Sequence, residues 1–235
     1  MAIFQKIYLS PKSTALAIKT AVVTLSRRFN IRSSLALAGI AGPLALTAGD
    51  LYAGLATPDY NMIRHSISSL ALSPIGWLQT IGFLALGLLV EIFAAGLLFN
   101  VKKARWFFPG IGALLAFGFG MLVIGAFATD LVKDAKTIEG TIHGVATAIS
   151  FSLFPVALFL LALSLKKDLE WKHLYRYTIV AGILSVLIAI ALQFFEDGIN
   201  YFGLVERILV ANMIIWVEVM AVNLLRISFK PHPRS

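Results

Sequence analysis

Six long apolar stretches constrain this chain more than any other feature of its sequence. A helix needs about 17–25 largely apolar residues to cross the ~30 Å hydrocarbon core of a bilayer, and each stretch has that length. The stretches are continuous, whereas the strands of a transmembrane β-barrel alternate between apolar and polar residues. We therefore predict an all-α fold, a polytopic membrane bundle of six transmembrane helices. The predicted spans are Ser34–Ala56, Gly76–Phe99, Trp106–Thr129, Thr141–Leu165, Thr178–Phe195 and Ile208–Leu225.

Composition agrees with a membrane protein and excludes several kinds of site. Hydrophobic residues make up 59% of the 235 residues and charged residues 14%, whereas soluble domains carry about 25% charged residues. The chain has no cysteine, which excludes disulfides, thiolate nucleophiles and cysteine-ligated metal centres. The sequence also lacks the HExxH and GxSxG patterns of metalloproteases and serine hydrolases, so we predict no cofactor and no specific metal site.

Basic residues are concentrated at one end of the predicted bundle. Sixteen of the 20 lysines and arginines lie in the two termini, the second–third connection and the fourth–fifth connection. The positive-inside rule places that end, with both termini, in the cytoplasm. This distribution accounts for the net charge of +8 without nucleic acid, which we do not expect as a partner. Most acidic residues lie at the opposite, outer end.

The basic N-terminal segment has a pattern of its own. Between Pro11 and Phe29, apolar residues recur at i, i+3 and i+4 spacing opposite a basic face. This pattern predicts a cytoplasmic amphipathic helix lying on the membrane surface. An organellar transit peptide, or a helix that docks a partner subunit, has a similar pattern. We expect residues 1–32 to form this segment, 33–227 the six-helix domain and 228–235 a cytoplasmic tail.

Two carboxylates fall well inside the predicted spans. Charges in hydrocarbon are costly and raise a functional hypothesis by default. Glu91 lies in the cytoplasmic half of the second span and Glu218 lies near the middle of the sixth. The two residues either form a proton path or are structural, with Glu91 reaching toward the surface and Glu218 bonding a neighbouring helix.

Small residues recur at every fourth position in three of the spans. In the fourth span they are Gly140, Gly144, Ala148 and Ser152. Helices in lipid associate largely through close packing of small residues. We therefore predict that these faces point into the bundle.

Polar side chains gather where the spans end at the outer rim. Asp130 follows the third span and His143 begins the fourth. Because a short connection makes these spans antiparallel neighbours, we expect the two side chains to face each other, with Arg64 and His65 entering from the preceding loop. Histidine with a carboxylate can hold a divalent metal or perform general acid–base catalysis. Ser66 and Ser68 in the same loop become nucleophiles only if a base approaches them.

Structural roles are the alternative for the same residues. Asp130 can pair with Arg64 or Arg207, and His143 can bond a loop carbonyl. Ser66 can cap the second helix. Asp50 lies close to the outer interface, so a ligand-binding site at the rim would draw on Asp50, Arg64, His65, Asp130, His143 and Arg207.

Short motifs at the rim resemble those of a known family. They are Arg64-His65-Ser66-Ile67-Ser68-Ser69-Leu70-Ala71, the pair Gly76-Trp77, Phe127 with Thr129 and Asp130, and Gly140 with His143. The sequence from about Ser34 to Arg226 resembles the prokaryotic six-helix membrane proteins grouped as domain of unknown function 998, although Ser69 and Ala71 replace an acidic residue and a glycine. The resemblance implies a bacterial or archaeal cell membrane and one cluster of Arg64, His65, Ser68, Asp130 and His143, but no reaction.

Three functional hypotheses follow. The first is an integral membrane protein whose extracytoplasmic rim pocket binds a lipid headgroup or a small polar ligand. The second is a membrane-embedded lipid hydrolase or transferase that uses His65, Asp130 and His143, with Ser68 as a further candidate. The third is an accessory subunit of a larger membrane complex. The expected partners are membrane lipids, with other membrane proteins in the third case.

Overall fold

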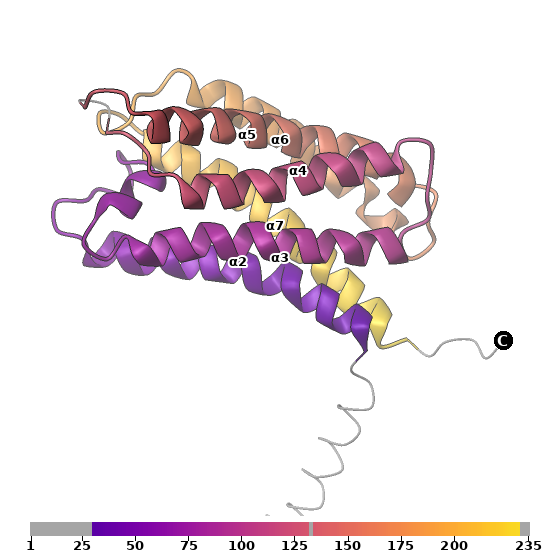
Figure 1. Ribbon diagram of the computed structural model, residues 1–235. Coiled ribbons are helices and arrows are strands. Elements are labelled where there is room, and N and C mark those ends of the chain that lie inside the picture. The colour runs from indigo at the N-terminus through magenta and orange to yellow at the C-terminus, as the bar shows by residue number, and fades with distance from the viewer. Residues whose placement is uncertain (1–29, 132–133, 231–235) are drawn as a thin grey trace, which may run out of the picture.

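The computed structural model describes residues 30–131 and 134–230, and these residues are helical with no strand. Six of the helices are long and apolar enough to cross a membrane, which confirms the predicted bundle. The chain is a multi-pass membrane protein (Figure 1). The six helices are α2 (Ile31–Ala56), α3 (Trp77–Asn100), α4 (Phe107–Ala126), α5 (Ile138–Leu165), α6 (Tyr175–Leu192) and α7 (Phe202–Ser228); short 3₁₀ turns form η1 (Ser68–Leu72) and η2 (Lys172–Leu174). The predicted amphipathic helix and tail residues 231–235 lie outside the described residues.

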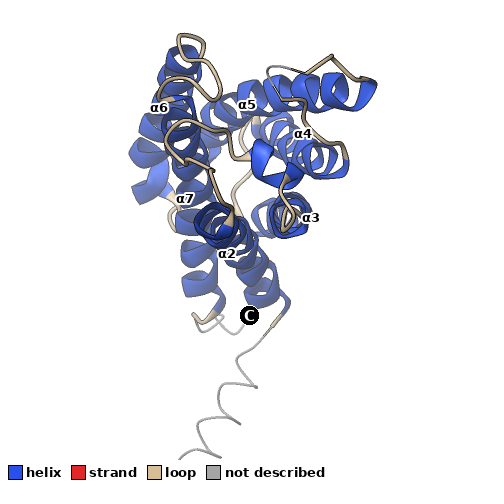
Figure 2. Cartoon of the chain, turned by 90° about the vertical axis from the view of Figure 1, so that its left-hand side faces the viewer, coloured by secondary structure: helices blue, strands red, loops and turns tan. Residues whose placement is uncertain are grey.

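The helices form a ring in which each helix packs against its neighbours in sequence and α7 returns to α2 (Figure 2). Short connections make consecutive helices antiparallel. The α2–α3, α4–α5 and α6–α7 connections therefore meet at one end, on the left in Figure 1. We call this end the rim. It is the end at which the sequence concentrates acidic residues.

Local signals explain where α2 begins. The Asn30 side chain accepts hydrogen bonds from the N–H groups of Arg32 and Ser33, and the Ser33 hydroxyl accepts one from the Asn30 N–H. This reciprocal capping box satisfies amide groups that the first turn of a helix leaves free. The Asn30 amide also donates to the Ser228 carbonyl at 3.1 Å. The first described helix is thus tied to the end of the last.

Aromatic side chains fill the centre of the ring. Phe117 and Phe154 have ring centroids 4.8 Å apart, and Phe154 meets Trp216 edge-on at 5.7 Å. The three residues come from α4, α5 and α7 and are fully buried. The indole N–H of Trp216 donates to the Thr178 hydroxyl at 3.1 Å, so the polar atom of this buried ring has a partner.

The small-residue face of α5 does not point into the bundle. Gly144, Ala148 and Ser152 are exposed, and only Gly140, at the rim, is half-buried. The prediction for this span was therefore wrong. The side of α5 that packs inward mixes large residues such as Phe154 and Leu158 with small ones such as Ala146 and Ser150. A face of small residues is left open toward α6.

Candidate functional site

Arg207, in the first turns of α7, forms hydrogen bonds with several residues of the rim. Its Nε and Nη2 atoms donate to the two carboxylate oxygens of Asp50 at 2.9 and 2.7 Å. Nη2 also donates to the Tyr60 hydroxyl at 2.6 Å, and Nη1 donates to the carbonyls of Met62 and His65 at 2.6 and 3.0 Å. All five N–H donors of a guanidinium are engaged within the protein. Asp50 and Arg207 are thus brought together, as an ion pair that holds the α2–α3 loop.

Tyr60 secures the same loop. Its hydroxyl donates to the Ser66 carbonyl at 2.7 Å while it accepts from Arg207. Burial raises the pKa of Tyr60 to about 12, against the opposing influence of Arg207, so the hydroxyl keeps its proton at neutral pH. The Arg64 carbonyl accepts from the N–H groups of Gly198 and Gly203, whereas the Arg64 side chain is exposed. The α2–α3 and α6–α7 connections are therefore joined by backbone bonds.

Ser68 and His143 form a hydrogen-bonded pair. The Ser68 hydroxyl lies 3.0 Å from Nε2 of His143, and Nδ1 of His143 lies 2.9 Å from the Phe127 carbonyl. Ser68 is 7% exposed and His143 is 6% exposed. The contact joins the start of η1 to the first turns of α5. His143 thus bonds a loop carbonyl, one of the structural roles considered above, and also meets a serine.

Asp130 bonds Thr137 and neither member of this pair. Its two carboxylate oxygens accept hydrogen bonds from the N–H and hydroxyl of Thr137 at 2.9 and 2.7 Å. Thr137 in turn caps α5 by accepting from the Gly140 N–H. The bonds from Thr137 hold the pKa of Asp130 below its usual range. Arg64, His65, Ser68, Asp130 and His143 therefore share the rim without forming a single hydrogen-bonded cluster.

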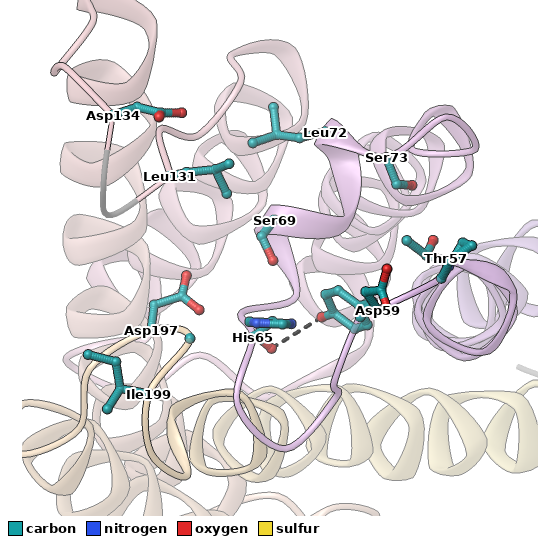
Figure 3. Close-up of a pocket in the computed structure, with 13 residues that line it drawn as sticks. Thr57, Asp59, His65, Ser69, Leu72, Ser73, Leu131, Asp134, Asp197 and Ile199 are labelled. Carbon is teal, nitrogen blue, oxygen red and sulfur yellow. Dashed lines mark hydrogen bonds between the residues drawn. The ribbon is translucent and has the colours of Figure 1, made fainter.

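A cavity of about 570 Å³, which we call the rim pocket, lies between the rim loops (Figure 3). Nδ1 of His65 accepts from the Asn61 N–H at 3.0 Å, which leaves the proton on Nε2 as a donor. In Figure 3 His65 is drawn between Asp59 and Asp197. The polar lining residues are Thr57, Asp59, Tyr60, His65, Ser69, Ser73, Asp134 and Asp197.

The three aspartates of the rim pocket were not among the predicted site residues. The sequence does show that most acidic residues lie at the outer end of the predicted bundle. It does not show which of these residues share a cavity. Glu206, 6% exposed on α7, was also missed; its Oε2 accepts from the Ile67 N–H at 2.7 Å. The described residues contain no group of three or more histidines, aspartates or glutamates able to hold a metal ion.

The two intramembrane acids lie on different helices. Glu91 is half-buried on α3, where it packs against Gly118 of α4, and Glu218 is half-buried on α7. Neither carboxylate hydrogen-bonds another described residue. A third polar residue within these spans, Asn212 on α7, donates hydrogen bonds to the Ala181 carbonyl and the Ser185 hydroxyl. The structure thus shows no chain of polar contacts between Glu91 and Glu218 within the described residues.

Comparison with known proteins gives one match. No curated protein and no solved structure is detectably similar to the chain. One family model, described as "Protein of unknown function (DUF998)", matches residues 40–223. This range covers more than half of the chain and includes the five spans from α3 to α7 almost entirely, as well as the rim. The chain is therefore a member of the DUF998 family of proteins of unknown function.

Proposed function

We propose that this membrane protein binds a small, positively charged polar ligand, or a lipid headgroup that carries an amine, in the rim pocket. The observation that carries this proposal is the meeting of Asp59, Asp134 and Asp197 in one cavity. None of the described residues lining that cavity is lysine or arginine. None of the three aspartates forms an ion pair with another described residue.

Charge makes this cavity selective. Carboxylates that share one cavity repel one another, and a bound cation relieves that repulsion. Asp197 uses one oxygen to accept from the Ser66 N–H at 2.8 Å, which orients its other oxygen. Leu72 and Ile199 supply an apolar wall for the carbon skeleton of a ligand. A few convergent polar groups in a largely apolar concavity are typical of small-molecule sites.

The site residues predicted from sequence take different roles in this proposal. His65 lines the pocket, where its Nε2–H can donate to the phosphate of a lipid headgroup but not to an ammonium group. Asp50 and Arg207 act indirectly by holding the loop that carries Asp59 and His65. Asp130 holds Thr137, the residue that caps α5. Arg64 stays outside it.

The positive-inside pattern supports a rim that faces the extracytoplasmic side, with both termini in the cytoplasm of a prokaryotic cell. A reporter active only in the cytoplasm is expected to work when fused after the last residue and to fail within residues 134–137. The reverse pattern of activity would overturn this orientation.

Binding is tested with putrescine as a free diamine and with phosphatidylethanolamine in nanodiscs as the lipid source. We expect Asp59→Asn and Asp197→Asn each to weaken binding about tenfold or more, equivalent to 1.4 kcal/mol. Glu139→Gln is the matched control, because Glu139 lies at the same end but outside the pocket. If the wild type binds only phosphatidylethanolamine, the ligand is a lipid headgroup, and if it binds only putrescine, the ligand is a free amine. Equal binding by the wild type and both aspartate variants would refute the proposal.

A further inference from the structure

The proton positions on His143 follow from its partners. The Phe127 carbonyl can only accept, so Nδ1 of His143 must carry a proton. In the neutral ring Nε2 is then an acceptor, and the Ser68 hydroxyl donates to it at 3.0 Å. A hydroxyl that donates to a histidine whose other nitrogen is held by a third group has the arrangement of an activated nucleophile.

Two carboxylates hold the backbone directly before Ser68. The N–H of Ser66 donates to Asp197 at 2.8 Å, and the N–H of Ile67 donates to Glu206 at 2.7 Å. The Ser66 hydroxyl accepts from the N–H of Ser69 and closes the turn. These bonds hold the segment that carries Ser68 in place, as supporting bonds do for reacting groups.

A cavity of about 440 Å³ begins at the Ser68–His143 pair and runs between α5 and α6, and we call it the lateral groove. Its rim end is lined by Ser68, His143 and Glu206, with Thr129 and Asp197 beside them. The side chain of Glu206 is buried, with only 6% of its surface exposed, and no described residue forms a hydrogen bond with its Oε1 atom. Polar groups thus converge at the head of the lateral groove.

The rest of the lateral groove lies along the membrane-spanning part of the bundle. Its walls include Gly144, Ala148 and Ser152 of α5, together with Ala189 and Leu192 of α6. The helix rises by about 12 Å between Gly144 and Ser152. Since these small residues are exposed on a membrane span, the occupant available to them is a lipid chain.

We propose that Ser68 and His143 form a catalytic pair that cleaves an ester bond of a membrane lipid whose acyl chain lies in the lateral groove. The Ser68 oxygen attacks the ester carbonyl carbon as its proton passes to Nε2 of His143. The bond between that carbon and the lipid alcohol breaks, and the departing alcohol takes the proton from His143. Water then hydrolyses the acyl-serine with His143 as base, which releases the fatty acid and restores Ser68. This activity does not depend on cation binding in the rim pocket.

A long-chain alkyl fluorophosphonate tests the nucleophile in nanodiscs. We expect the wild type to be labelled and Ser68→Ala not to be labelled. Ser34→Ala, a change at an exposed serine of α2 that lines neither cavity, should be labelled as the wild type is. His143→Gln should slow labelling about 100-fold or more, the lower bound for loss of a general base. Wild-type labelling no faster than that of Ser68→Ala would overturn the proposal.

A single introduced thiol separates a reactive pair from a structural one, because the chain contains no cysteine. In Ser68→Cys, His143 should lower the thiol pKa, and iodoacetamide should react at pH 7 at least tenfold faster than in Ser68→Cys/His143→Gln. Ser69→Cys reports the rate of a neighbouring thiol without this contact, and thermal unfolding verifies that each variant is folded. A purely structural bond would change the melting temperature but leave the alkylation rates of the two Ser68→Cys proteins equal, which would also overturn the proposal.

Discussion

Replacing Arg207 by glutamine should be among the most destabilising single changes at the rim. The side chains of Arg207 and Asp50 are only 14% and 12% exposed, so the substitution leaves a buried carboxylate without its counter-charge. It also removes donors from the Met62 and His65 carbonyls. Removing one partner of a buried ion pair costs about 3–5 kcal/mol. In a chain of this length that corresponds to a fall in melting temperature of roughly 6–20 °C.

The assay is thermal unfolding in mild detergent, followed by loss of helical circular dichroism. Arg64→Gln is the matched control, because the Arg64 side chain is exposed on the loop that Arg207 holds; we expect it to change stability by less than about 0.5 kcal/mol. The double variant Asp50→Asn/Arg207→Gln should lose less than the sum of the two single losses, since it leaves no unpaired charge. An Arg207→Gln protein that melts within about 2 °C of Arg64→Gln would refute the reasoning.

Two further predictions concern the loops of the rim. The carboxylate of Asp130 binds Thr137 and has a lowered pKa, so its contribution to stability is present above the ordinary aspartate pKa of about 4 and is lost as pH falls through the lower folded value. Melting temperatures measured from pH 5 to pH 3 should therefore fall less steeply in Asp130→Asn than in the wild type. An equal slope in the two proteins would contradict this prediction. A Cβ on Gly203 would overlap backbone carbonyl oxygens of the α2–α3 loop, so Gly203→Ala should lower the free energy of unfolding by about 1–3 kcal/mol. Gly112→Ala is the control, because its Cβ enters open space and should not destabilise the protein. Equal melting temperatures of the two variants would contradict this prediction and show that the loop moves freely.

Hydropathy located five of the six spans to within about three residues. The predicted Gly76–Phe99 corresponds to α3, Trp77–Asn100. The largest difference is at α7, which begins at Phe202 whereas the predicted span began at Ile208. Glu206 and Arg207 made the first turns look too polar for a membrane helix. Their partners lie 139 and 157 residues away in sequence, so a local window could not show that these charges are satisfied.

The rim shows the same limit. The sequence placed Ser68, Asp130 and His143 at one end of the bundle, and the motifs that resemble the DUF998 family include all three. The expected pairing of Asp130 with His143 rested on their closeness along the chain. In the structure Thr137, seven residues from Asp130, supplies two donors to its carboxylate, while η1 brings Ser68 to His143 from 75 residues away. The carboxylate of Asp130 therefore bonds a residue close in sequence, whereas His143 bonds a hydroxyl that is distant in sequence.

Sequence by itself determined that the chain crosses a membrane as six helices, because hydrocarbon offers no partner for a backbone N–H or carbonyl and a long apolar run must satisfy these groups internally. It also determined which residues lie at each end, since span length and loop position fix depth. The tertiary structure alone decided that Arg207 meets Asp50, that Ser68 meets His143, and that three aspartates share a cavity. Such pairings depend on separations of about 3 Å between atoms on different helices and loops, and spacing along a chain does not specify distances of that size.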